Sequence, residues 1–371
     1  MPFGLSYTAI GIAGLGTGLI VGFAVRRAKL CSMGAIESAL VSGDWRRMKV
    51  FGLALAIAIA GTQALILAGL FDPAQSTYVP TRVAWLSAAL GSVVFGYGMA
   101  LVGTCAFGSL VRLGGGDLRS LVSMLIFGAV AYAGLRGVLV GPRLTFLEPI
   151  ALEMPGPVPS SLADVATRLF NLDMRAIVSL ALVTGLTLPV LLDRRLRQAP
   201  RLIIAGVLLG LGVLGGWIFT SVVADEFATN LRVQSLTFVA PVARALYGAL
   251  LGTGELLDFG VMSVFGVIIG AFAAALWGKE FRWDAFDDHH EMRQHLLGAA
   301  LMGLGGVLAG GCTIGQGLTA GSLLAVTGPI TVGGILLGAR LGLLFLVEGS
   351  IVEMIRARLR AMRNRSITDN D

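Results

Sequence analysis

Long apolar stretches alternate with short polar segments along almost the whole chain. Nine of these stretches can cross a bilayer as helices, which takes about 20 residues each and satisfies every backbone group inside the lipid. The pattern predicts spans at about 5–25, 50–70, 84–104, 118–140, 174–192, 202–223, 259–277, 296–311 and 320–347. The intervening stretches 145–172 and 224–257 are expected to be surface loops or short interfacial helices.

Composition indicates the same class. Hydrophobic residues make up 56% of the 371 residues and charged residues 13%, whereas an average soluble domain is about 25% charged. We therefore predict an all-α polytopic membrane protein that forms a single membrane domain over 1–371. It is expected to have about nine transmembrane helices, together with short or re-entrant helices.

Basic residues are concentrated in alternate loops. If the N-terminus lies outside, the loops 26–49, 105–119, 193–201, 278–295 and 352–371 face the cytoplasm and hold 20 of the 28 lysines and arginines. Cytoplasmic loops of membrane proteins carry such an excess, so the sequence predicts a periplasmic N-terminus and a cytoplasmic C-terminus. This bias also accounts for the net charge of +6 without any nucleic-acid partner.

An internal repeat relates two segments that lie 207 residues apart, and nine residue types coincide at that offset. Leu90, Gly91, Gly96, Gly98, Leu101, Gly103, Cys105, Gly108 and Gly114 correspond to Leu297, Gly298, Gly303, Gly305, Leu308, Gly310, Cys312, Gly315 and Gly321. Cysteine occurs only three times in the chain. The coincidence of two of them therefore indicates a duplication that kept its thiol twice.

The predicted topology gives the two copies opposite orientations, because the span before Cys312 comes five spans after the span before Cys105. The simplest scheme makes 1–140 the first half, 141–200 a connector that includes the span 174–192, and 201–371 the second half. Inverted repeats of this kind form substrate sites near the membrane centre. The two cysteine loops are therefore expected to approach one another from opposite sides, in an hourglass-like arrangement.

Glycines surround Cys105 and Cys312 too densely for a continuous helix. A break frees backbone N–H groups and exposes half-helix ends whose partial positive charge attracts anions. The candidate substrate contacts are these two thiols, the third thiol Cys31 next to a basic pair, and Arg112, which would attract an anion at the inner mouth. The loop positions grouped with them are Gly103, Thr104, Gly108, Gly310, Gly311, Thr313 and Gly315.

Structural explanations of the same residues remain open at this point. The cysteines would equally serve as small buried hydrophobic residues, and the glycines as tightly packed turns. Arg112 would equally be a topology-determining residue without a ligand. A Cys105–Cys312 disulfide is a further alternative if the two loops meet.

Other function classes lack their characteristic residues. No Asp, Glu or His falls inside any predicted span, although carriers that couple to protons usually need such a group in the membrane. No phosphate-binding loop of the ATPase type occurs in the sequence. The histidines His289, His290 and His295 lie in a polar stretch without defined ligand spacing. We predict no metal and no cofactor.

The motifs resemble the YeeE/YedE family of bacterial sulfur transporters, over nearly the whole chain. The resemblance rests on Cys31 after its basic pair, on the run Gly103-Thr104-Cys105-Ala106-Phe107-Gly108-Ser109-Leu110-Val111-Arg112, and on Gly310-Gly311-Cys312-Thr313-Ile314-Gly315-Gln316-Gly317-Leu318-Thr319-Ala320-Gly321. It implies a non-enzymatic inner-membrane transporter that takes up thiosulfate or a related inorganic sulfur anion. It also implies a small TusA-like cytoplasmic partner.

The resemblance further implies a relay of thiols. Cys312 would lie on the outer side, Cys105 in the middle and Cys31 towards the cytoplasm, with each S–H group donating to the passing anion. The selenium-related branch of the family leaves a selenium or other sulfur species open as the passenger. Two functions outside transport also stay open: a membrane thiol oxidoreductase, which would normally need a paired dithiol, and a subunit that docks a cytoplasmic sulfurtransferase.

Overall fold

The computed structural model describes residues 7–80, 82–147, 151–153, 161–170, 174–222, 233–252 and 257–348. The main helices are α1 (Tyr7–Ala28), α2 (Ser32–Val41), α3 (Arg46–Leu67), α4 (Trp85–Val102), α5 (Ala106–Gly114), α6 (Leu118–Arg136), α8 (Leu162–Phe170), α9 (Arg175–Leu192), α11 (Pro200–Trp217), α12 (Ala240–Leu251), α13 (Phe259–Trp277), α14 (His289–Leu308) and α15 (Thr327–Glu348). The basic tail 352–371 and most of 148–160 lie outside the described residues.

Shorter elements complete the described chain. They are the helical turns η1 (Pro73–Gln75), α7 (Val140–Pro142), η2 (Arg143–Leu147), α10 (Arg194–Arg197), η3 (Ile218–Val222) and η5 (Gly315–Ala320), and the strands β1 (Arg82–Val83) and β2 (Leu152–Glu153). The strands form one antiparallel pair that joins Arg82 to Glu153 and Val83 to Leu152. This two-residue pair lies beside an otherwise helical fold, so the predicted all-α class is confirmed.

Eight helical segments among the described residues are long and apolar enough to cross a membrane. They match eight of the nine predicted spans. The ninth prediction, 296–311, corresponds to α14, which begins at His289 because the Asp288 side chain accepts a hydrogen bond of 2.7 Å from the Glu291 amide. Its first two turns carry several charged and imidazole groups, so α14 combines a polar beginning with an apolar second half.

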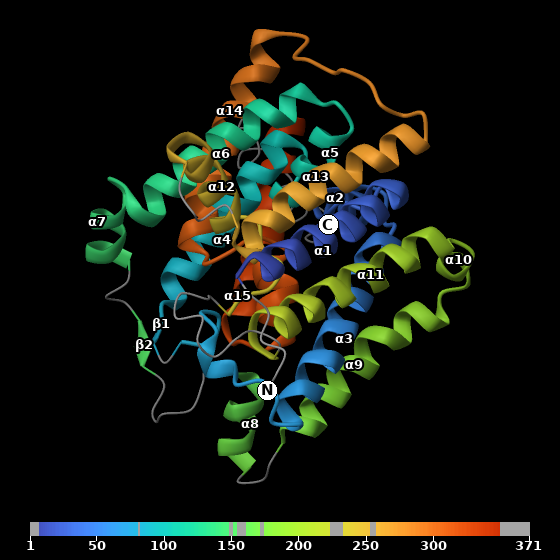
Figure 1. Cartoon of the computed structure of the whole chain (residues 1–371), viewed down its shortest axis with the longest axis vertical. Helices are drawn as coiled ribbons and strands as arrows, with labels where there is room; N and C mark the ends of the chain where they lie inside the picture. Colours follow the sequence, from blue (N-terminus) through green and yellow to red (C-terminus); the bar gives the residue numbers. More distant parts are fainter. Residues whose placement is uncertain are drawn as a thin grey trace, which may run out of the picture.

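The long helices pack in matched pairs around the centre of the bundle (Figure 1). Helix α1 packs against α13, and α3 packs against α11. Helix α4 packs against α15 and also against α14, which in turn packs against α6. Glycines permit the close approach: a Cβ at Gly18 of α1 would collide with the Ser263 carbonyl of α13, as expected where small residues line helix interfaces in membranes.

Four short helical elements, α2, α5, α12 and η5, fill the spaces between the long helices. Helix α5 packs on α6 and α13, and η5 packs on α15 and α3. Helix α2 packs on α3 and α15, and α12 packs on α13 and α6. Surface loops or short interfacial helices were expected at 224–257: a short helix, α12, is present there, but the segment before it does not lie on the surface, because residues 234–239 are all buried.

The polar loops predicted to share one side of the membrane do meet at one end of the bundle. Lys49 contacts Asp193 at 2.6 Å, which joins the loops 26–49 and 193–201. Lys29 contacts Glu280 at 3.4 Å, and the Leu118 amide donates to the Asp284 carbonyl at 2.8 Å. In Figure 1 this end holds α10 and α2, and the opposite end holds β1, β2, α7 and α8.

Helix α9 lies on the outside of the bundle beside α3 (Figure 1). Only 11% of this helix is buried inside the bundle. Its exposed side chains include Ile177, Leu180, Leu188 and Leu191. An exposed apolar surface of this size marks a face that contacts lipid or another protein. It corresponds to the predicted connector between the two halves.

Candidate functional site

Two of the three cysteines stand at the beginning of short helices. Cys31 is the N-terminal capping residue of α2, and Cys105 holds the same position in α5. The Gly108 amide donates a hydrogen bond of 3.2 Å to the Cys105 sulfur, as a capping side chain does in the first turn of a helix. Both thiols therefore lie where a helix carries partial positive charge.

The two helix beginnings meet around Gly108. The Cys31 and Cys105 side chains hydrogen-bond to one another, and the Cys31 sulfur lies 3.4 Å from the Thr104 hydroxyl. A Cβ atom at Gly108 would be 2.9 Å from the Cys31 sulfur and 3.4 Å from the Cys105 sulfur. Glycine at this position therefore keeps open the space into which both thiols point.

Cys312 approaches this cluster from the second half of the chain. The Gly315 amide lies 3.4 Å from its sulfur, and the backbone groups of Ile314 and Phe238 also interact with it. The chain reaches Cys312 through Gly310 and Gly311, whose φ angles of 70° and 158° favour glycine. Cys312 is 0% exposed and Cys105 1% exposed.

The Cys31 segment and the Cys312 turn are joined by hydroxyls rather than by thiols. The Ser32 hydroxyl, next to Cys31, lies 3.1 Å from the Thr313 hydroxyl, next to Cys312. All three cysteines are free, so the alternative of a Cys105–Cys312 disulfide is not realised. The contact with the Cys312 turn therefore comes from the segment that contains Cys31, and Cys31 in turn contacts Cys105.

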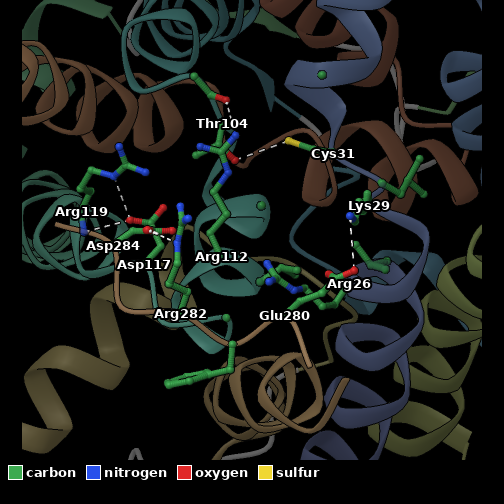
Figure 2. A pocket seen from close by; sticks show the side chains of 18 of the residues that line it. Arg26, Lys29, Cys31, Thr104, Arg112, Asp117, Arg119, Glu280, Arg282 and Asp284 are labelled. Carbon is green, nitrogen blue, oxygen red and sulfur yellow. Dashed lines mark hydrogen bonds and ion pairs between the residues drawn. The ribbon is translucent and has the colours of Figure 1, made fainter. Parts of the chain in front are cut away.

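A cavity of about 940 Å³ opens from the end of the bundle that holds the polar loops and reaches Cys31. The residues that line this cavity include Cys31, Gly103, Thr104, Gly108 and Arg112. Figure 2 shows Cys31, Thr104 and Arg112 around it. The Arg112 guanidinium donates a hydrogen bond of 3.1 Å to the Gly103 carbonyl. This contact fixes a cation in the same cavity as the Cys31 thiol.

The lining of this inner cavity is predominantly basic. The basic residues are Arg26, Lys29, Arg47, Arg112, Arg119, Lys279 and Arg282, and the acidic residues are Glu37, Asp117, Glu280 and Asp284. Several of the acids form ion pairs, including Arg119–Asp117 at 3.2 Å and Arg282–Asp284 at 2.7 Å. An excess of cations in a concave site attracts anions and raises their local concentration.

A second cavity, of about 250 Å³, lies towards the other end of the bundle. The two cavities lie at opposite ends of helix α6. Asp117, directly before α6, lines the inner cavity, and Leu135, near the end of α6, lines the second cavity. The loop residues Gly310 and Gly311 line the second cavity directly before Cys312. Between the two cavities Phe107 and Phe238 lie with ring centroids 4.8 Å apart.

The second, outer cavity contains polar residues that sequence analysis did not identify. Tyr78, Gln234, Thr237 and Arg244 line it. Tyr78 hydrogen-bonds to Thr237, and burial raises the pKa of Tyr78 to about 12, so its hydroxyl stays protonated near neutral pH. Thr237 crowds Gly315 closely, which connects this cavity to the turn after Cys312.

The histidines do not form a metal site. Among the described residues no group of three or more His, Cys, Asp or Glu side chains is placed to hold a metal ion. His289, His290 and His295 lie in the first two turns of α14 rather than in a loop, and the His295 ring lies 3.3 Å from the Ser123 hydroxyl.

Membrane-spanning helices, polar cavities towards both ends of the bundle and thiols beside their lining residues define a multi-pass membrane protein with polar sites inside the bundle. Sequence comparison identifies the family. The profile described as Sulphur transport matches residues 27–341. The chain therefore belongs to the sulphur transport family, which consists of transporters rather than enzymes, as the YeeE/YedE resemblance implied.

Two relatives align over most of their length. The chain is 28% identical over 361 residues to the thiosulfate transporter TsuA of Escherichia coli (strain K12), covering 91% of this chain and 92% of that protein. It is 27% identical over 351 residues to the thiosulfate transporter TsuA of Spirochaeta thermophila, covering 84% of this chain and 92% of that protein. Transport of a sulfur anion is the function that the family supports.

Proposed function

We propose that this protein takes up thiosulfate or a closely related inorganic sulfur anion through a pathway lined by Cys312, Cys105 and Cys31. One observation carries the proposal: each of the three free cysteines lines one of two cavities or directly follows a residue that does, and the wider cavity is basic. The names of the relatives indicate the passenger.

The outer end of the pathway is the turn that contains Cys312. The anion would meet the Gly310 and Gly311 backbone from the outer cavity and then the Cys312 thiol, with the Gly315 amide and the Thr313 hydroxyl beside it. Backbone amides in a non-helical turn form a concave surface of N–H donors that suits an anion.

The central step passes the anion from one half of the chain to the other. Thr313 and Ser32 are in contact, and beyond them the Cys31 side chain interacts with the Thr104 hydroxyl and with the Cys105 side chain. An anion at this point would replace these weak internal hydrogen bonds with contacts to itself. Several weak adjacent sites favour conduction, because each releases what it binds.

The inner cavity would serve as the exit. Arg112 lies beside Gly103 at its inner end, and the surrounding basic side chains draw an anion out of the narrow region. The ions in bulk solution screen this attraction beyond about 10 Å at 0.1 M salt. The anion therefore leaves without being held tightly.

Neutral thiols suit this task better than thiolates. A thiol is a weak hydrogen-bond donor with a polarizable sulfur, which matches the soft terminal sulfur of thiosulfate. A thiolate would repel a dianion. The cysteines therefore act as donors in the proposed pathway, and no bond between substrate and protein is formed.

The packing of the helices supports an inverted repeat as the basis of the pathway. In chain order α1, α2, α3, α4, α5 and α6 of the residues 1–140 correspond to α11, α12, α13, α14, η5 and α15 of the residues 201–371. Exchanging the two sets turns the contact of α1 with α13 into that of α11 with α3, and the contact of α4 with α15 into that of α14 with α6. We infer that α9 is the connector that inverts the second half.

The orientation and surroundings of the protein follow the charge distribution. We propose that the end with the inner cavity faces the cytoplasm of a bacterial inner membrane, because the basic loops gather there. The N-terminus would then lie in the periplasm. Lipid would cover the exposed apolar side chains of α9, and a TusA-like cytoplasmic protein would accept the sulfur anion at the inner cavity.

Flux measurements on the purified protein test this function. Proteoliposomes that contain the full chain should take up radiolabelled thiosulfate saturably, whereas protein-free liposomes should not. A panel of sulfate, sulfite, selenite and selenate as competitors identifies the passenger. The proposal fails if none of these anions crosses or competes, and a selenium anion that outcompetes thiosulfate would move the assignment to selenium transport.

A further inference from the structure

The outer cavity contains a buried arginine that the proposed pathway does not use. Arg244 on α12 is 7% exposed, and its Nη1 atom lies 2.7 Å from Oδ2 of Asp258. Its Nη2 atom donates to the side-chain oxygen Oε1 of Gln234 at 3.0 Å, and the side-chain nitrogen Nε2 of Gln234 donates to Asp258. Removing a guanidinium from water is costly unless such partners are present, so this triad holds a cation inside an apolar bundle.

Only two members of this triad line the outer cavity. Arg244 and Gln234 line the outer cavity together with Tyr78 and Thr237, whereas Asp258 is not among the lining residues. The cation and two hydroxyl groups therefore face the space through which an anion must reach Gly310 and Gly311, and the counter-ion lies behind. Asp258 reduces the field of Arg244 in the cavity without occupying the cavity.

We propose that Arg244 is the anion-binding residue of the outer cavity and that Asp258 limits how tightly it holds a small divalent oxyanion. The inference rests on the proposed function, since it names the side chain that captures the sulfur anion before the thiols. A guanidinium forms strong, charge-assisted hydrogen bonds to oxyanions. A transport site must also release its ligand, and a fixed counter-ion behind the arginine provides that weakening.

The protein offers a matched control for a purely structural role of the Arg244–Asp258 ion pair. Arg175 and Asp164 form another largely buried pair, at 2.6 Å, between α9 and α8. Neither residue lines the inner or the outer cavity. Substitutions there change the stability of the protein without changing the field in either cavity.

Equilibrium binding of radiolabelled thiosulfate to the purified full chain in detergent tests the inference. Arg244→Gln should raise the Kd by about tenfold or more, the loss expected for one charged hydrogen bond. Arg244→Lys should retain part of the affinity. Asp258→Asn should lower the Kd by roughly three- to tenfold, because the cation loses its neutralising partner. Arg175→Gln and Asp164→Asn should leave the Kd unchanged.

The two variants are expected to change the Kd in opposite directions, which a folding defect in both would not do. A structural pair predicts weaker binding in both Arg244→Gln and Asp258→Asn, and that result overturns the inference, as does a Kd that neither variant changes or an absence of binding to the wild type. In uptake, Asp258→Asn should lower KM and also lower kcat, because release becomes slower.

Binding and flux also separate this inference from the proposed function. Cys105→Ser and Cys312→Ser should lose uptake and keep binding that depends on Arg244. A wild-type protein that binds thiosulfate through Arg244 and transports none contradicts the proposed function and supports the inference. A protein that transports thiosulfate with a Kd that Arg244→Gln does not change contradicts the inference alone.

Discussion

Ser32 and Thr313, 281 residues apart in the chain, lie with their hydroxyl oxygens 3.1 Å apart at the centre of the bundle. Each follows a cysteine directly. The contact joins the Cys31 segment to the Cys312 turn, one from each half of the chain, and Cys31 in turn contacts Cys105.

Removing this hydrogen bond should weaken the link between the halves. A buried hydrogen bond contributes about 1 kcal/mol, so Ser32→Ala and Thr313→Val should each lower thermal stability slightly and reduce uptake several-fold. A double-mutant cycle on unfolding and on kcat/KM measures the coupling. Effects that simply add in the double variant would show that the two hydroxyls act independently.

Gly108 should be essential for flux because it borders both inner thiols. A Cβ there would lie 2.9 Å from the Cys31 sulfur, and overpacking of this kind costs about 1–3 kcal/mol. We expect Gly108→Ala to reduce uptake by roughly tenfold or more. Gly185→Ala on α9 is the matched control, since no atom lies within 4 Å of the added group. Normal uptake by Gly108→Ala would exclude this narrow passage.

Arg112 should contribute an electrostatic attraction that salt weakens. Arg112→Gln should raise the KM for uptake several-fold at low ionic strength, and the difference from wild type should shrink above about 0.3 M salt. Arg112→Lys should keep most of the attraction and lose the directed hydrogen bond to Gly103. Arg194, an exposed arginine at the same end of the bundle, provides the control substitution to Gln. A defect that does not respond to salt would assign Arg112 to structure alone.

Cys31 should be accessible from the cytoplasmic side only. It is partly exposed in the inner cavity, whereas Cys105 and Cys312 are buried. In a Cys105→Ser/Cys312→Ser background, a membrane-impermeant thiol reagent should label Cys31 in inside-out vesicles and not in right-side-out cells. Labelling from the outside would reverse the orientation that the basic loops indicate.

Much of the fold follows directly from the sequence. Apolar runs of membrane length predict the spans within a few residues, because lipid allows few other conformations. The repeat around Cys105 and Cys312 identified both turns, and the Cys312 turn contacts the Cys31 segment through Thr313 and Ser32. Arg112 was expected at the inner mouth and lines the inner cavity.

The segment 234–239 shows where sequence reasoning fails. Its polar residues favour a surface loop, yet they are buried because each finds a distant partner. Ser235 donates to the Val213 carbonyl at 2.5 Å, and Thr220 donates to the Gln234 carbonyl at 2.7 Å. Partners far apart in the chain leave no periodic signal, so the burial of Gln234 and Arg244 was not predictable.

The contact of Cys31 with Cys105 was also not predictable from spacing. The two residues belong to the same half of the chain, and the repeat directed attention to Cys105 and Cys312 instead. Two short helices, α2 and α5, bring the thiols together by their N-terminal ends. The relative placement of short helices depends on packing with α6, α13 and α15, which a single sequence does not encode in any local pattern.

The role of the thiols is the central claim, and thiosulfate flux in cysteine variants tests it most directly. The initial rate of radiolabelled thiosulfate uptake should be measured in proteoliposomes with equal amounts of wild type, Cys31→Ser, Cys105→Ser and Cys312→Ser. We predict that Cys105→Ser and Cys312→Ser abolish uptake and that Cys31→Ser, which lines the wider cavity, reduces it. Uptake at the wild-type rate in both Cys105→Ser and Cys312→Ser would contradict the pathway.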